Sequence, residues 1–207
     1  MKIRMEPLVT AVAIGAVIWI VGSLVGLIIG YRSFQNVITS PIFDPATLEE
    51  INTSADPMAA LFGEDFQSMM VLSSVANLLQ CLSWLFSGIS AGAAYVVVHR
   101  RYEPHAMGGE AAAGAVAGAL AVVAGYLVST ILSLVVIFPL VGDFMGQIVS
   151  VGGPEVAQMM DQMGSMMVVM VAVGAICSIV FYGAIGGVTG ALGGFIGNSL
   201  TGAAREG

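Results

Sequence analysis

The stretch YGAIGGVTGALGGFIG, residues 182–197, decides the fold of this chain. It lies within residues 163–204, which carry no charge. Wound as a helix at about 100° per residue, its seven glycines all fall on one side and its bulky apolar residues fall on the other. One smooth face and one bulky face are typical of a membrane helix that lies close against another helix.

The composition of the whole chain places it in a membrane. Of its 207 residues, 57% are hydrophobic and only 9% are charged, whereas a soluble domain carries about 25% charged residues. The two cysteines, Cys81 and Cys177, lie inside apolar segments and indicate neither a disulfide framework nor a metal-binding spacing. The sequence therefore predicts an integral membrane protein.

Four apolar segments are long enough to cross a bilayer, which takes roughly 20 residues per helix. They cover residues 8–30, 69–98, 111–141 and 166–199. The first is too long for the apolar part of a signal peptide, about 7–15 residues, so we expect it to stay as a transmembrane helix. The predicted fold class is an all-α integral membrane protein, with residues 1–207 forming a single domain of four helices.

The positions of lysine and arginine predict the orientation of these helices. Basic residues are enriched on the cytoplasmic side of membrane proteins. Five of the six fall at one end of the four helices, and only Arg32 falls at the other; the five are Lys2, Arg4, Arg100, Arg101 and Arg205. We therefore expect both termini to be cytoplasmic in a plasma-membrane protein, with the acidic loop 31–67 facing outward.

The two halves of the chain resemble each other in order. The end of the first outer loop can be aligned without gaps with a segment of the second half. This alignment pairs Pro57 with Pro154, Glu64 with Asp161, Ser68 with Ser165 and Met69 with Met166. This match predicts two tandem helical hairpins of parallel orientation, residues 1–100 and 101–207. Helix starts are expected at Asp44–Pro45, Asp56–Pro57 and Gly153–Pro154, because proline favours the first helical position.

Every predicted helix carries a stripe of small residues, a pattern known as a glycine zipper. Because lipid provides no hydrophobic drive for helix association, close approach of backbones must supply it. The stripes serve either packing within one bundle or, for the wide glycine face of the last helix, contact with another protein. The candidate packing residues are Gly15, Gly22, Gly26, Gly88, Gly92, Gly114, Gly118, Gly125, Gly183, Gly186, Gly187, Gly190, Gly194 and Gly197.

Asn77 and Gln80 are the candidate intramembrane polar residues. They lie one turn apart on the polar face of the second helix, which should point into the bundle because an unpaired amide in lipid is costly. They either fix the helix register through hydrogen bonds between helices or line a narrow path for a neutral solute or ion. No charged residue lies in mid-membrane, which argues against a proton relay.

The remaining motifs indicate no catalytic, metal or cofactor site. Catalytic and phosphate-binding motifs are missing. His99, Glu103 and His105 share a short loop but lack further ligands, and Arg100 and Arg101 are expected to anchor the helix end at lipid headgroups. The outer methionines would suit Cu(I) but also fill apolar gaps; they are Met159, Met160, Met163, Met166, Met167 and Met170.

The sequence therefore predicts a membrane protein that is not an enzyme and acts through glycine-mediated helix packing. It would be an oligomerising scaffold or an accessory subunit of a membrane complex. The alternative is a small channel or permease whose path Asn77 and Gln80 line. The expected partners are the lipid bilayer and further copies or other membrane subunits, with no nucleic acid.

Overall fold

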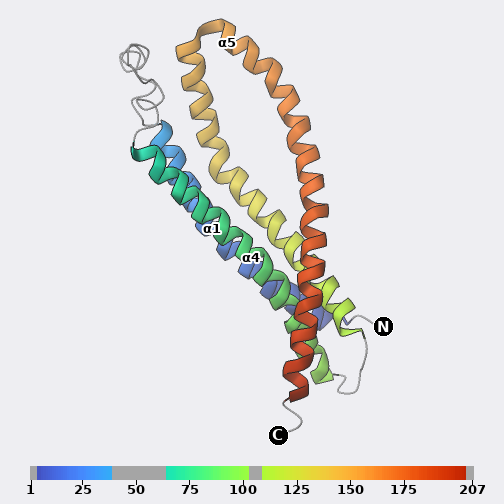
Figure 1. The fold of residues 1–207 in the computed structure, drawn as a ribbon. Helices are drawn as coiled ribbons and strands as arrows, with labels where there is room; N and C mark the ends of the chain where they lie inside the picture. Colours follow the sequence, from blue (N-terminus) through green and yellow to red (C-terminus); the bar gives the residue numbers. More distant parts are fainter. Residues whose placement is uncertain (1–3, 39–63, 103–108, 204–207) are drawn as a thin grey trace. The chain divides into compact units, whose positions relative to one another are not determined.

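The fold was obtained as a computed structural model, which describes residues 4–38, 64–102 and 109–203. Over this part of the chain it is entirely helical, with α1 at Met5–Ile38, α4 at Glu64–Tyr102 and α5 at Glu110–Ala203 (Figure 1). The predicted helix starts at Asp44–Pro45 and Asp56–Pro57 lie outside the described residues.

The described helices contain four stretches that are long and apolar enough to cross a membrane. These spans are Met5–Arg32 in α1, Val71–Tyr102 in α4, and Glu110–Asp143 and Met170–Gly202 in α5. We call them the first to fourth spans. The prediction of an all-helical chain with four membrane-spanning helices is confirmed at this level.

The ends of the helices follow local sequence signals. Glu6 and Glu110 lie in the first turns of α1 and α5, where a carboxylate favours the helix dipole. The last turn of α4 is basic, which suits the opposite end of the dipole. Gly109 precedes α5 with φ 113, a left-handed conformation that glycine adopts without strain. The sequence thus favours the end of α4 and the start of α5 at these positions.

The third and fourth spans belong to one helix, α5, which is continuous between them. Helical structure runs from Glu110 to Ala203 and passes through Gly153 and Pro154. The prediction that a separate helix begins at Gly153–Pro154 is therefore wrong. The side chains of the outer methionines other than Met170 lie outside the part that the structure describes.

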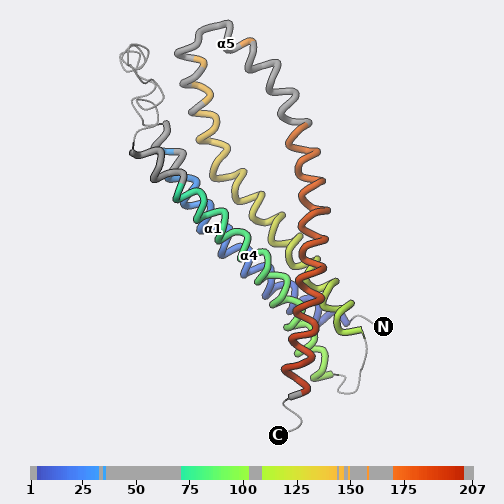
Figure 2. The backbone as a smooth tube through the Cα atoms, viewed as in Figure 1, coloured from blue at the N-terminus to red at the C-terminus, as the bar shows by residue number. Residues whose placement is uncertain are grey.

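The chain divides into two compact units. The first, which we call the packed unit, comprises Met1–Leu24, Leu79–Ile131 and Val173–Gly207. The second comprises Val25–Leu78 and Leu132–Ala172. The packed unit takes a section from each of the four spans. In Figure 2 the start of α1, the end of α4 and both ends of α5 come together in this unit.

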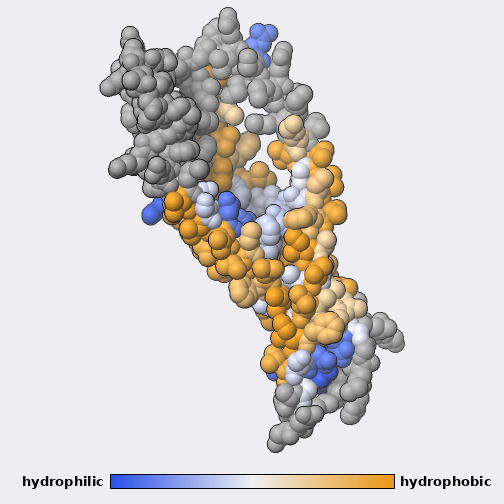
Figure 3. Space-filling view, viewed as in Figure 1, coloured by the Kyte–Doolittle hydropathy of each residue, from blue (hydrophilic) through white to orange (hydrophobic). Residues whose placement is uncertain are grey.

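The packed unit places small residues inside and large apolar residues outside. Ala11, Ala91, Ala117 and Ala121 are fully buried. Large apolar side chains cover its surface, which is orange along the spans in Figure 3; exposed examples are Val9, Leu85, Phe86, Val188, Leu192 and Phe195. This reversal of the soluble pattern is expected where lipid surrounds the helices and close backbone approach holds them together.

Candidate functional site

The third and fourth spans pack backbone against backbone. A Cβ atom added to Gly118 would lie 2.6 Å from the Cα atom of Gly190, and one added to Gly190 would lie 2.8 Å from the Cα atom of Gly118. One turn away, a Cβ atom on Gly114 would lie 3.0 Å from the Cα atom of Gly194. Any side chain at these positions would have to push two helix backbones apart. We call this contact the glycine seam.

The fourth span presents the same glycine face to α4 as well. A Cβ atom on Gly92 would lie 3.0 Å from the Cα atom of Gly190, and one on Gly193 would lie 2.8 Å from the carbonyl carbon of Ile89. Gly197 meets Ala93 in the same way. The glycine face is therefore wide because it packs against two helices of its own chain. One of the sequence-based interpretations required this face to contact another protein. The buried part of the face is not available for such a contact.

The first span joins the packed unit through Gly15. A Cβ atom on Gly15 would lie 2.6 Å from the Cβ atom of Ala121 and 2.8 Å from the carbonyl oxygen of Ser87. The buried hydroxyl of Ser87 donates a hydrogen bond of 2.8 Å to the carbonyl oxygen of Gly15. Close packing and one interhelical hydrogen bond thus fix the first span against the second and third.

The remaining candidate packing glycines divide into two groups. Four meet close neighbours in the packed unit: Gly22 faces Ser83, Gly88 faces Thr189, Gly125 faces Trp19, and Gly186 faces Gly118 and Val122. Gly183 and Gly187 would make only ordinary contacts, at 3.5 Å to Val123 and 3.9 Å to Ala115, and Gly26 is half-buried in the second unit. The structure adds Gly193 to the packing glycines. The sequence placed Gly193 on the glycine face of the last helix, but it was not among the candidate packing residues.

The two candidate polar residues belong to different units. Asn77 is exposed and lies in the second unit, whereas Gln80 is half-buried and lies in the packed unit. Both lie on the continuous helix α4, three residues apart. Below Gln80, along α4 toward Tyr102, the packed unit contains a group of aromatic side chains instead.

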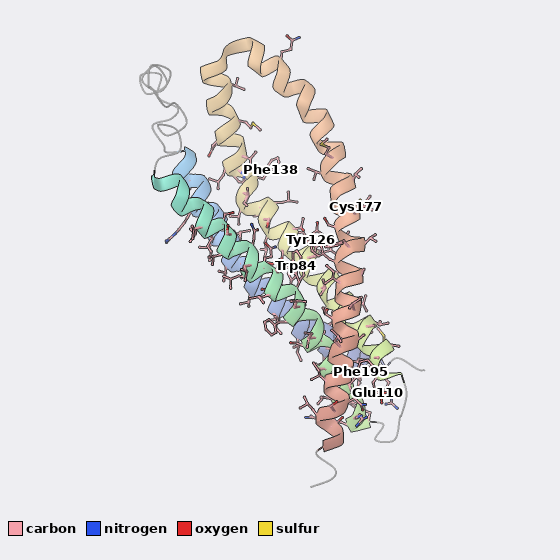
Figure 4. The ribbon with its side chains drawn as sticks, viewed as in Figure 1. Trp84, Glu110, Tyr126, Phe138, Cys177 and Phe195 are labelled. Atoms are coloured by element: carbon pink, nitrogen blue, oxygen red, sulfur yellow. The ribbon has the colours of Figure 1, made fainter. Side chains whose placement is uncertain are left out.

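This group takes one aromatic residue from each span: Trp19, Trp84, Tyr126 and Tyr182. The two indoles are stacked, with ring centroids 5.8 Å apart and planes 10° from parallel. Tyr182 presents its edge to both, at 5.3 Å from Trp19 and 4.7 Å from Trp84, and lies 4.8 Å from Tyr126. Figure 4 shows Trp84 and Tyr126 at the same level of the unit. We call these four residues the aromatic layer.

Sequence reasoning did not identify the aromatic layer. Its only signals were that the two tryptophans of the chain lie in the first two spans and that a tyrosine lies in each of the other two. The residues are far apart in the sequence, so nothing but the fold brings them together. Such a layer adds contact area and aromatic pair energy of about 0.5–1.5 kcal/mol per pair.

Charged residues gather at the end of the packed unit where α4 ends and α5 begins, which is blue in Figure 3. The guanidinium of Arg100 lies 3.6 Å from the carboxylate of Glu110, and both side chains are largely buried, at 14% and 19% exposed. The same guanidinium donates a hydrogen bond to the side-chain oxygen of Asn198. Arg100 thus ties three spans together, in contrast to the predicted role as a headgroup anchor.

Replacing Arg100 by alanine is expected to destabilise the packed unit by about 2 kcal/mol, because it removes the largely buried cation that contacts the Glu110 carboxylate and the Asn198 amide. The neighbouring Arg101 is exposed, so Arg101→Ala should change stability by no more than about 0.5 kcal/mol. Unfolding of each variant by denaturing detergent, followed by circular dichroism, measures both. Equal effects of the two substitutions would contradict an inward role for Arg100.

The geometry defines a multi-pass helical membrane protein with a glycine-packed interior. Among the described positions, no three or more His, Cys, Asp or Glu residues come together as a metal site would need. Comparison of the chain with protein-family models, with curated proteins and with solved structures gives no match in any of the three.

Proposed function

We propose that this chain is a multi-pass membrane protein without a catalytic site, which acts through helix packing as an oligomerising scaffold or as an accessory subunit of a membrane complex. The glycine seam carries this proposal. Backbone contacts at Gly118 and Gly190 make the packed unit a rigid body, because neither partner has a side chain that can change rotamer. A rigid body whose outer face is mostly apolar along the spans suits the support of neighbouring membrane proteins.

The interior of the packed unit supports a scaffold better than a channel. At the level of the glycine seam, Ser87, Ala91, Ala117 and Ala121 are all 0% exposed. A solute that followed the axis of the unit would have to separate these helices. The alternative function, a small channel or permease, draws support from the half-buried Gln80 above this level, and it requires the seam to open.

Two further features belong to the proposal. The chain lies in the plasma membrane with both termini cytoplasmic, and its two hairpins arose by tandem duplication. The contacts at the charged end support the common location of the termini. Arg4 at the start of α1 lies over the ring of Tyr102 at the end of α4, 5.7 Å from its centroid, and Asn198 near the end of α5 accepts from Arg100. Both contacts support the proposal that the two termini lie on one side of the membrane.

Purification of the tagged full chain from its native membrane in mild detergent tests the scaffold proposal. We expect a particle that contains a second copy or another membrane subunit in fixed stoichiometry. Cys81 and Cys177 are free and exposed, so a thiol cross-linker applied to native membranes gives an independent reading, with a Cys81→Ser, Cys177→Ser double variant as the control. A particle with the mass of one chain, and no thiol-dependent adduct, would contradict the proposal. Solute flux in reconstituted vesicles would favour the channel instead.

A further inference from the structure

The aromatic layer contains buried polar atoms that the fold does not satisfy. Within the described chain, the indole Nε1 atoms of Trp19 and Trp84 and the hydroxyl oxygen of Ser23 are buried and have no hydrogen-bond partner. Ser23 follows Trp19 by one helical turn, and the indole of Trp84 stacks on that of Trp19. All three atoms therefore belong to one small region of the packed unit.

These atoms have a clear chemical requirement. An indole N–H only donates hydrogen bonds, and a buried donor without an acceptor costs about 1–3 kcal/mol. Three other buried hydroxyls of the same unit are paired: Ser87 donates to Gly15, Ser129 to Gly125 and Thr189 to Ile185. The hydroxyl of Tyr95, nearer the charged end of the unit, is buried without a partner as well. The aromatic layer differs in that both of its indoles, which can only donate, are buried without an acceptor, and they call for one that the helices do not provide.

The surroundings limit what that acceptor is. Trp19 is 1% exposed, and a Cβ atom on Gly125 would lie 3.0 Å from its Cδ1 atom, beside the indole nitrogen. The residues in contact here present flat rings to one another, which favours a planar partner. The sequence has no Asp, Glu, Lys or Arg within residues 8–31, 79–98, 111–131 and 173–204, so no counter-charge is available and the partner must be neutral.

Access to the layer is from the lipid side. Trp84 and Tyr182 are only half-buried, although Trp19 behind them is enclosed. Phe181, beside Tyr182, is exposed, and Leu85, beside Trp84, is exposed as well. A molecule that reaches the layer by this side comes from the membrane and must dissolve there.

We propose that the aromatic layer binds a neutral, planar, lipid-soluble molecule with carbonyl acceptors, of the quinone class. Its carbonyl oxygens accept hydrogen bonds from the indole N–H groups of Trp19 and Trp84, with Ser23 as the third polar contact, and its ring packs against Tyr182. This site goes beyond the scaffold function and does not depend on it. It requires no electron transfer by the chain.

Tryptophan fluorescence tests this site directly, because the only two tryptophans of the chain both lie in the layer. A decyl-substituted benzoquinone is titrated into the full chain in detergent micelles. We expect saturable quenching with about one quinone bound per chain. Trp19→Phe, Trp84→Phe and Ser23→Ala should each weaken the apparent affinity by about fivefold, the loss of one neutral hydrogen bond.

The controls separate binding from collision in the micelle. Ser199→Ala removes an exposed hydroxyl that bonds within its own helix and should leave the affinity unchanged. A decyl-substituted arene without carbonyl groups should give no saturable signal. Quenching that rises linearly, with the slope found for tryptophan octyl ester in empty micelles, would overturn the site. Saturable quenching with the same affinity in all three variants would overturn the assignment equally. Should either tryptophan variant fail to fold by circular dichroism, Ser23→Ala decides the question.

Discussion

Gly190→Leu is expected to abolish the packed unit. Gly190 lies at the meeting point of three spans, where its neighbours are the backbones of Gly92, Gly114 and Gly118. Backbone atoms cannot rotate away as a side chain can, so a leucine side chain there must separate the helices. Overpacking a core costs about 1–3 kcal/mol or occasionally more, and we expect at least the upper value here. The measurement is the monodisperse fraction on size exclusion, with unfolding by denaturing detergent.

Gly187→Leu is the matched control for this result. It lies on the same span within one turn, but a Cβ atom there would meet only the carbonyl oxygen of Ala115, at 3.9 Å. It should therefore fold with stability close to that of the natural chain. Because both substitutions add the same side chain to the same helix, a shared loss would point to helix propensity or insertion. A Gly190→Leu protein that stays monodisperse with unchanged unfolding would refute the glycine seam.

Trp19→Ala is expected to give the second largest effect. Trp19 is 1% exposed and contacts the rings of Trp84 and Tyr182, while Gly125 leaves room for it on the third span. Removing the indole opens a cavity between four spans that these helices cannot close. The cost for such a truncation in a core is about 3–5 kcal/mol. Denaturing-detergent unfolding followed by circular dichroism measures it.

Phe195→Ala provides the comparison for Trp19→Ala. Phe195 is 61% exposed, so its ring faces the surroundings of the packed unit, and lipid replaces its contacts after truncation. We expect a change within about 0.5 kcal/mol, as for an ordinary surface site. If both variants lost the same stability, burial in the aromatic layer would not be the cause. If Trp19→Ala had no effect, the layer would not belong to the core.

Much of the packing could be predicted from the helical period of the glycines. Gly186, Gly190, Gly193, Gly194 and Gly197 were expected on one face, and all of them lie buried at helix contacts. The number of neighbours on that face could not be predicted, because a stripe gives the direction of a contact but not its partner. A wide face suggested an external protein, and the fold instead provides two helices of the same chain.

In the candidate site, too, the sequence predicted part of the arrangement and only the fold provided the rest. Arg100 has the sequence context of a headgroup anchor at a helix end, and only the fold brings Glu110 and Asn198 within reach of it. Trp19, Trp84 and Tyr182 carry no local signal, since each is an ordinary apolar residue in its own span. The unpaired indole N–H groups of the two tryptophans become visible only once the neighbouring helices enclose them.

The sequence by itself determined that the chain is helical, that four of its segments suit a membrane, and which face of each helix is smooth. Those properties depend on the composition and on the period of single helices, and both are local. Tertiary structure decided that the glycine face of residues 182–197 meets α4 and the third span together, and that one aromatic residue per span forms a layer above it. The physical reason is that glycine fixes how near two helices approach, whereas which helices approach depends on the packing of all four.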